Sequence, residues 1–536
     1  MDKKRREMLS LVLPSALVAL SSSTKVFAAD DGQTKNNTLA PLLTTNTEDS
    51  ISFKKFLVEK KGTVNATQAL IDAVTSGIPV EIPHDYVLRI ESAGIPTVSG
   101  ARLFGQAGTM PRVIIDHSDL DKPQFILGGR NKIENLIFRY PNQKLYLKKG
   151  EAPVKYKPLF CGGGYYSEFR NLDIGNAYYG FLIGTKEISS SHVVIENVIG
   201  SPIFRGLSLD CCLDIPRISD VHFNYNYLID DGFKYDQSLK QWIYDHATAF
   251  HIGRCDFATF FRLFSYGYHR GIYLRSERSL GSADNCRFIS CDVDMSRHPI
   301  WFQNWQNKVS VLDSKLVGNA EGKKMGFLSG LPSYNVIRNT DNGQAILDNL
   351  DINDYTSHAL TTQSNTIVSN CRFSRYGSGN KLSAGIFVNE QVPLHIDNTS
   401  LNGSSGIKTV GVYSDISKHA LNLGSSVQFS GQTDASFYWS NGAVLLDNSV
   451  DLGGARGVSD ISTVTHIPKN YYSEDMPSAG NYFLPGDNVI LTKLSNAVED
   501  AVGRYILTGF KRLTASNARG DNHEENVDWV GVKLYL

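Results

Sequence analysis

Between Gly271 and Asn307 the chain gathers side chains of the kinds that act as acids, bases and sugar contacts, in the stretch GIYLRSERSLGSADNCRFISCDVDMSRHPIWFQNWQN. Glycoside hydrolysis needs two carboxyl groups, about 5 Å apart for retention of configuration or about 6.5–9.5 Å apart for inversion. We expect Glu277 to be the acid, because nearby aromatic rings raise the pKa of a carboxyl group, and Asp245 or Asp294 to be its partner. The alternative for Glu277 is a solvated carboxylate paired with a neighbouring arginine.

A second chemistry would use other residues of the same region. β-Elimination on a uronic-acid polymer needs a base and a cation that neutralises the sugar carboxylate. Tyr273 or His251 would be the base and Arg275 the cation, with His269 as a further candidate. The acidic residues do not follow the spacing of a calcium loop, and we expect no metal and no other cofactor.

Aromatic and polar residues around these groups predict carbohydrate binding. Aromatic rings pack on the C–H groups of sugars, and arginine binds a carboxylate through two hydrogen bonds. The expected binding residues are Asp210, Tyr227, Trp242, Trp301, Gln303 and Trp305. Tyr227 and Trp242 belong to the insertion from Asn224 to His246, which would form a loop beside the site. An interface between protomers is the alternative for the outward tryptophans.

Short strands would position these residues, because side chains alternate between the two faces of a strand. Ile272 and Leu274 would fill the interior, as would Ile300 and Phe302 in the later strand. The expected outward set is Asp210, His251, Tyr273, Arg275, Glu277, Trp301, Gln303 and Trp305.

An Asn or Asp followed by strand residues recurs along the chain. Its members are Asn135, Asn171, Asn197, Asp220, Asn285, Asp313, Asn349, Asn370 and Asn398. They lie 21 to 36 residues apart, except for one gap of 65 residues that would hold a further position near Arg262. Asn tolerates unusual backbone angles and can bond to an Asn one turn away. Repeats of this length predict stacked coils, and the fold class is expected to be all-β, a right-handed parallel β-helix.

A second repeat is offset from the first and begins with a small residue. Its members start at Gly206, Ala249, Gly271, Pro299 and Gly385, and each is followed by an apolar strand. Two strand positions that recur together strengthen the prediction of a solenoid.

Composition divides the chain into five parts. They are a signal-like or docking segment at 1–29, a linker at 30–50, a capping module at 51–115, the β-helix at 116–465 and a small β module at 466–536. The capping module should contain a helix from Thr67 to Val74, with Asn65 as its N-cap and Gly77 after its end.

Charge and cysteine usage exclude several classes of protein. The 53 basic and 54 acidic residues give a formal net charge of -1, so no excess of positive charge points to nucleic acid. The apolar run from Leu9 to Leu20 is too short to span a bilayer. The seven cysteines follow no zinc spacing, and we expect free thiols that are mostly buried.

Two stretches resemble known families. Asn65-Ala-Thr-Gln-Ala-Leu70, followed by Val80-Glu-Ile-Pro83, resembles the start of pectate-lyase-like β-helices. The C-terminal part resembles the end module of bacteriophage tailspike depolymerases in Pro477-Ser-Ala-Gly480, Tyr482, Pro485-Gly-Asp487, Gly509-Phe-Lys-Arg-Leu-Thr514 and Asp528-Trp529.

This resemblance implies a homotrimer that belongs to the virion and attaches to the phage tail or baseplate through its N-terminus. Its expected partner is a bacterial capsular polysaccharide at the host cell surface, which it would bind and cleave. Residues 1–29 depart from that pattern, because a virion protein needs no export signal. A secreted or periplasmic bacterial lyase or hydrolase is therefore an alternative, and a spike that binds polysaccharide without cleaving it is another.

Overall fold

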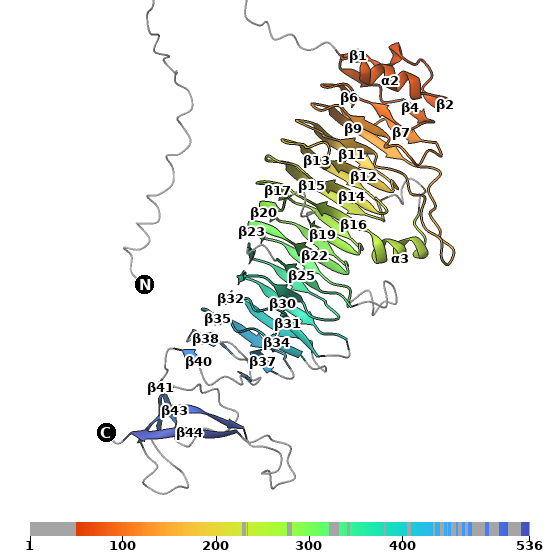
Figure 1. Cartoon of the computed structure of the whole chain (residues 1–536). Coiled ribbons are helices and arrows are strands. Elements are labelled where there is room, and N and C mark those ends of the chain that lie inside the picture. Colours follow the sequence, from red (N-terminus) through yellow and green to blue (C-terminus); the bar gives the residue numbers. More distant parts are fainter. Residues whose placement is uncertain are drawn as a thin grey trace, which may run out of the picture. The chain divides into compact units, whose positions relative to one another are not determined.

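Short strands separated by tight bends make up most of the described chain, and each pairs in parallel with the strands one turn earlier and one turn later. The computed structural model describes residues 50–227, 232, 234–275, 281–320, 332–339, 343–379, 382–404, 409–432, 435–439, 444–447 and 449–451, and short strands between 457 and 534. Figure 1 shows the strands stacked turn upon turn. Crossovers between parallel strands are right-handed, and the fold is the predicted right-handed parallel β-helix.

One sheet of fourteen strands forms one side of the coil. Its strands are β5 (Ile95–Pro96), β8 (Phe125–Leu127), β10 (Phe160–Gly162), β12 (Tyr179–Ile183), β14 (Arg205–Leu209), β16 (Thr248–Ile252), β19 (Arg270–Arg275), β22 (His298–Gln303), β25 (Asn335–Arg338), β28 (Leu360–Gln363), β31 (Ser383–Val388), β34 (Thr409–Ser414), β37 (Ala435–Trp439) and β39 (Gly457–Val458).

A sheet of twenty-six strands forms the rest of the coil as two ladders. The first ladder contains β1 (Ile51–Ser52), β3 (Val80–Ile82), β6 (Arg102–Gly105), β9 (Lys132–Arg139), β11 (Glu168–Ile174), β13 (Val194–Gly200), β15 (Arg217–Asn224), β17 (Thr259–Phe261), β20 (Ala283–Ile289), β23 (Trp305–Leu312), β26 (Gln344–Asp348), β29 (Thr366–Ser369), β32 (Leu394–Asp397), β35 (Leu421–Leu423), β38 (Val444–Leu446) and β40 (Val464–His466). The second contains β2 (Lys61–Asn65), β4 (Val87–Ile90), β7 (Arg112–Ile115), β18 (Phe264–Tyr266), β21 (Asp292–Asp294), β24 (Lys315–Val317), β27 (Asp351–Asn353), β30 (Arg372–Tyr376), β33 (Ser400–Gly403) and β36 (Gln428–Ser430). The long strands β9, β11, β13 and β15 belong to both ladders.

The predicted Asn repeat lies at the bend between these two ladders. Asn135, Asn171 and Asn197 have φ of 58°, 51° and 53°, in the left-handed region that favours Asn over most residues. Asn171 Nδ2 donates to Asn135 Oδ1 at 2.9 Å, and Asn197 Nδ2 donates to Asn171 Oδ1 at 2.8 Å. The bends at Asn135, Asn171 and Asn197 are therefore tied to one another by side-chain hydrogen bonds.

The structure corrects one member of the repeat. Arg262 occupies the bend after Asp220, and its guanidinium donates to the Asp220 carboxylate at 2.7 Å, which confirms the position expected in the long gap. Ile289 pairs with Leu312, so Ser290 and not Asn285 stands in register with Asp313. Asn285 also has a positive φ, but it lies at the other end of the same strand.

The interior of the coil is apolar and partly built from stacked aromatic rings. Phe125, Phe160 and Phe181 occupy one position on three successive turns, with ring centroids 5.3 Å and 5.2 Å apart. All seven cysteines are free thiols; Cys161 is half-buried and the other six are buried, as the sequence predicts.

The capping helix is present as expected. Helix α2 (Thr67–Thr75) has Ala66 as its N-cap and not the predicted Asn65, which precedes it and accepts a hydrogen bond from the Thr67 backbone N–H through Oδ1 at 2.9 Å. The helix ends before Gly77, which has φ of 72°. Leu70 and Val74 of α2 pack into the core of the coil. The helix therefore gives the first turns of the coil an apolar covering.

The aromatic insertion is not a simple loop, because it contains helix α3 (Gln237–His246). Asp236 Oδ1 caps the helix by accepting from the Ser238 N–H at 2.8 Å. Leu239 and Ile243, four residues apart, are buried in the core cluster, which explains why this part folds as a helix. Figure 1 shows α3 beside β16, the strand that follows it.

The C-terminal module contains a separate four-stranded sheet. Its strands are β41 (Asn470–Ser473), β42 (Asn488–Leu491), β43 (Gly503–Arg512) and β44 (Val527–Leu534). Residues 1–49 lie outside the described residues, and the proposed segment boundaries stay predictions. In the described part of the chain, every helix is too short or too polar to cross a membrane.

The ladder of bends predicts a measurable cost for removing one asparagine. Asn171→Ala should lower the free energy of unfolding by about 2 kcal/mol, because Ala is strained at positive φ and two hydrogen bonds are lost. Asn171→Gly should cost about 1 kcal/mol or less, because Gly accepts the backbone angle. Urea unfolding of the two variants separates the cost of backbone strain from the cost of the lost hydrogen bonds. Equal losses of unfolding free energy in the two variants would contradict the proposed strain.

Candidate functional site

Five strands of the fourteen-stranded sheet share one register column, and three of them carry predicted site residues in it. Leu182 pairs with Ser208, Ser208 with His251, His251 with Tyr273, and Tyr273 with Trp301. Side chains in one column of a parallel sheet point to the same side. We call the outward side of β12, β14, β16, β19 and β22 the outer face, and it brings His251, Tyr273 and Trp301 together.

A second column of polar residues also lies on the outer face. Tyr179, Arg205, Thr248, Arg270 and His298 follow one another in register on the same five strands. Strict alternation would not have placed them beside Tyr273, because they stand three residues before the first column.

The small residue of the second repeat explains why alternation fails. A Cβ on Gly271 would lie 2.4 Å from the Val293 side chain in the core, so Gly271 and Ile272 both face inward. Arg270 and Tyr273 are thereby placed on the same side. Gly206 makes a similar approach to the ring of Phe223. The recurring small residue was the sequence signal for the second column.

Arg270 lies in the corner between two aromatic rings. Its guanidinium carbon is 4.5 Å from the ring centroid of Tyr273 and 4.7 Å from that of Trp301. Burial lowers the pKa of Arg270, and the cation–π contacts offset part of the cost of burying its charge. Arg270 Nε and Trp301 Nε1 are buried without a hydrogen-bond partner, a state that native structures rarely leave unexplained.

Positive charge on the outer face is not balanced locally. The guanidinium carbon of Arg205 lies 5.1 Å from the Phe204 ring centroid and 5.8 Å from that of Tyr179. Among the described residues, no carboxylate lies within ion-pair distance of Arg205 or Arg270. An anionic ligand would therefore gain from both arginines without breaking an ion pair within the described part of the chain.

The hydroxyl of Tyr273 is held between two polar neighbours. Arg275 Nη1 donates to Tyr273 Oη at 3.2 Å, and Tyr273 Oη donates to Gln303 Oε1 at 3.4 Å. Arg275 is exposed at the edge of the outer face, and Gln303 is half-buried. The hydroxyl is therefore fixed between a cationic donor and an amide acceptor.

Burial keeps the histidines of this region neutral. The ring of His251 stacks on Tyr273, with centroids 5.1 Å apart and planes at 21°. Burial, with a further contribution from Arg205, lowers the pKa of His251 to about 3, and burial lowers that of His269 to about 4. The pKa of His298 is also well below its usual value because of burial.

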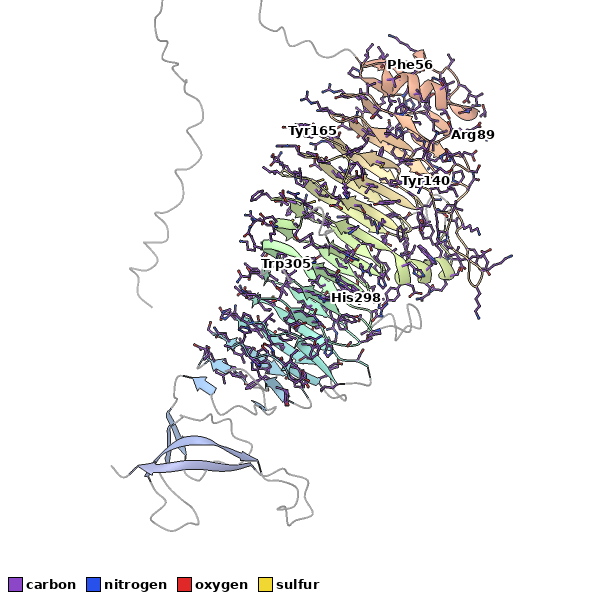
Figure 2. All side chains as sticks on the ribbon, viewed as in Figure 1. Phe56, Arg89, Tyr140, Tyr165, His298 and Trp305 are labelled. Carbon is purple, nitrogen blue, oxygen red and sulfur yellow. The ribbon has the colours of Figure 1, made fainter. Side chains whose placement is uncertain are left out.

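Helix α3 borders the outer face at the start of its strands. The ring of Trp242 lies 6.2 Å from Tyr178 and 6.3 Å from Phe204, which stack on each other at 5.0 Å. Figure 2 shows His298 on the same side of the β-helix as α3, and Trp305 on the other side. The insertion therefore forms a wall beside the cluster, with Trp242 packed into it.

Carboxylates are not paired on the outer face in the described part of the chain. Glu277 lies outside the described residues. Asp245 is on α3 and accepts a hydrogen bond from Gln241 Nε2 at 3.1 Å. The prediction for Asp294 is corrected, because it ends β21 on the twenty-six-stranded sheet, where burial raises its pKa. The described residues also contain no group of three side chains arranged to hold a metal ion.

Two expected binding residues have other positions. Trp305 is fully buried in the core and not outward, because Asn304, with φ of 56°, turns the chain between Gln303 and Trp305. Asp210 follows β14, and its Oδ1 accepts from the backbone N–H groups of Cys211 and Arg254 at 2.8 Å and 2.9 Å.

Tyr227 is exposed in the turn after β15, at the start of the insertion. This position leaves its predicted contact with sugar untested. Its side chain belongs to the same insertion as Trp242, whose ring packs against the sheet through Phe204.

Comparison with known proteins identifies relatives of the fold. No family model and no curated protein matches the sequence. The N-terminal fragment of bacteriophage phi29 gene product 12 matches with 13% identity over 79% of this chain and 75% of that chain, at a TM-score of 0.52. The catalytic unit of a GH87 α-1,3-glucanase from Streptomyces thermodiastaticus matches with 13% identity over 72% of this chain and 69% of that chain, at a TM-score of 0.48.

Tailspike protein 3 of bacteriophage CBA120 matches with 12% identity over 85% of this chain and 67% of that chain, at a TM-score of 0.40. The phi29 match, with a TM-score above 0.5, supports a shared fold. The resemblance to phage β-helix proteins that the sequence suggests is therefore confirmed at the level of the fold, and the chain is a parallel β-helix protein.

The buried neutral histidines predict that acid destabilises the fold. The unfolded chain binds protons near pH 6.5 while His251 stays neutral to about pH 3, so stability is present above 6.5 and is lost as the pH falls toward 3. His251→Gln should reduce the slope of unfolding free energy against pH by about 1.4 kcal/mol per pH unit near pH 5. Urea unfolding between pH 7 and 4 measures this slope, and an unchanged slope would contradict burial of a neutral His251.

Proposed function

We propose that the chain is a depolymerase that binds and cleaves a bacterial capsular or other surface polysaccharide on the outer face. The carrying observation is that two arginines of the outer face have no described carboxylate partner. Arg270 packs against the Tyr273 ring, and Arg205 lies two strands earlier, over the Tyr179 ring. Such a surface suits a polymer with carboxylate groups, and uronic acids are the sugars that carry them. The same cluster supplies a phenol oxygen beside the cations.

We infer β-elimination as the chemistry that these residues fit best. Tyr273 as phenolate would take the proton from the carbon next to the sugar carboxylate, while the arginines neutralise that carboxylate. The bond from the neighbouring carbon to the glycosidic oxygen breaks as a carbon–carbon double bond forms. The Tyr273 hydroxyl then returns the proton to the leaving oxygen, which restores the phenolate and balances the step.

Tyr273 is a better candidate base than His251. A base with a pKa of about 3 accepts a proton weakly at neutral pH. His251 instead packs its ring on Tyr273 and fixes the phenol in place. We assign His251 as a positioning residue, and also Arg275, whose guanidinium donates to Tyr273 Oη and holds the phenol in place.

Hydrolysis, the chemistry that the sequence alone favours, is our second candidate, because Glu277 stands two residues after Arg275 in the sequence. It would need a second carboxyl group within about 9.5 Å, and Asp245 on α3 would have to supply it. A hydrolase releases reducing ends alone, whereas a lyase also gives an unsaturated uronide that absorbs ultraviolet light. A binding-only spike gives neither signal.

Substitution of the phenol tests the lyase chemistry. Tyr273→Phe should lower kcat on the cognate capsule at least about 100-fold, because general base catalysis is lost. Tyr413→Phe is the matched control, since Tyr413 lies on the same sheet with its hydroxyl toward Asp415 and away from the cluster. Ultraviolet absorbance of the product measures both rates.

Full activity of the Tyr273→Phe variant would show that Tyr273 is not the base. Full activity of Glu277→Gln would remove the leading acid for hydrolysis. Loss of activity in Glu277→Gln alone, with reducing ends and no ultraviolet signal in the wild type, would favour the hydrolase.

We further propose that the chain is a homotrimeric tailspike of a phage virion, joined to the tail or baseplate through its N-terminus and acting at the host surface. The resemblance of the C-terminal module to tailspike depolymerases supports this proposal. Sedimentation equilibrium of the full chain should give three times the 59.3 kDa mass of one chain. A monomeric mass would contradict the tailspike proposal and favour the secreted enzyme.

A further inference from the structure

A third column of polar side chains lies where successive strands of the fourteen-stranded sheet end, at the last residue of each strand. Arg275 pairs with Gln303, Gln303 with Arg338, and Arg338 with Gln363, on β19, β22, β25 and β28. Both arginines are exposed and both glutamines are half-buried. Guanidinium and amide groups therefore alternate, one on each turn of the coil.

The spacing of this column is set by the sheet. Neighbouring strands lie about 4.8 Å apart, so Arg275 and Arg338 are roughly 10 Å apart along the coil. One sugar of an extended polysaccharide advances by about one strand spacing. Two cations separated by one amide thus match a carboxylate on every second sugar, with a neutral sugar between them.

A pocket lies where the column passes Arg338. It has a volume of about 410 Å3 and is lined by Arg338, Asn339, Gln363, Glu390, Gln391 and Val392. Asn339 forms a fixed part of its wall, because its Nδ2 donates to the Trp305 carbonyl at 2.9 Å and its Oδ1 accepts from the Trp305 N–H at 3.2 Å. Charged and amide groups give this pocket the chemistry of a sugar site.

The neighbouring column makes room for a sugar at these turns. The column of His251, Tyr273 and Trp301 continues as Val336 and Thr361, which are much smaller side chains. Larger rings then return in the same column, one on each turn. They are Phe387, Tyr413 and Tyr438, with centroids 5.6 Å and 5.0 Å apart, and the last two rings stack. The open stretch is therefore bounded by aromatic residues at both ends.

We propose that the substrate lies along the axis of the coil and is an acidic polysaccharide in which a uronic acid alternates with a neutral sugar. Arg275 and Arg338 bind successive carboxylates, and Gln303 and Gln363 bind the neutral sugars between them. The pocket at Arg338 is a binding subsite two turns away from Tyr273. This inference rests on the proposed function, since it places the polymer across the same outer face.

Binding of capsular polysaccharides with defined repeating units tests the match of spacing. The panel holds polymers with a carboxylate on every second sugar, on every sugar, and on none. The full-length chain carrying Tyr273→Phe should bind the first class most tightly. Arg338→Gln in that chain should weaken binding to this class at least about tenfold, because a charge-assisted pair is lost. Tightest binding to either other class, or to none of the three, would overturn the inference.

Arg287→Gln is the matched control, because Arg287 is equally exposed but lies on β20 of the other sheet. It should leave the affinity unchanged. Glu390→Gln should leave the affinity unchanged or raise it, since a negative charge leaves the pocket. An affinity that is insensitive to Arg338→Gln, or equally sensitive to Arg287→Gln, would also overturn the inference.

The two proposals fail in different ways. If Tyr273→Phe abolishes cleavage while Arg338→Gln leaves binding unchanged, the outer face is catalytic and only the extended subsite is wrong. If Tyr273→Phe retains full cleavage but Arg338→Gln weakens binding, the subsite stands and the catalytic assignment is wrong.

Discussion

The bend between the two ladders is the constraint on which the rest of the structure depends. A residue with positive φ at the same place in the described turns from Asn135 to Ser426 fixes where the chain changes direction, and side-chain hydrogen bonds such as Asn171 to Asn135 hold bends in line. Once the bends are aligned, the backbone register of all strands follows. A slip of one residue would turn every apolar side chain outward, so the ladder protects the core as well as the turn.

The same register creates function by placing like positions one above another. His251, Tyr273 and Trp301 are far apart in the sequence but stand on adjacent strands. Stacking also has a cost, because Arg205 and Arg270 repel each other across a partly buried surface. Aromatic rings around each guanidinium offset that cost through cation–π contacts. These contacts explain how the solenoid can keep Arg205 and Arg270 without a carboxylate partner among its described residues.

The sequence was sufficient to predict the fold class, because Asn at a left-handed bend and the spacing of the repeats have direct physical meanings. It also placed Tyr273, Arg275 and Gln303 on one side, since a single strand preserves alternation. The prediction of outward side chains failed where the backbone interrupts the alternation of side chains between the two faces of a strand. Asn304 turns the chain before Trp305 and sends that ring into the core, and Gly271 faces inward and allows Arg270 to join the outer face. The prediction of Asp294 as the partner of Glu277 failed for a different reason, because sequence alone does not say which sheet a strand joins.

The position of the insertion explains how one part of a repetitive surface becomes different from the rest. A coil built only of identical turns would present the same groove along its whole length. Helix α3 enters between β15 and β16 and packs Trp242 against Phe204, next to Arg205. It therefore encloses the turns that carry Arg205, His251 and Arg270 and leaves later turns open. Enclosure lowers the local dielectric constant and strengthens the attraction between arginine and a bound carboxylate. The insertion thus makes the turns beside α3 chemically different from the later turns, which carry Arg338 and Gln363.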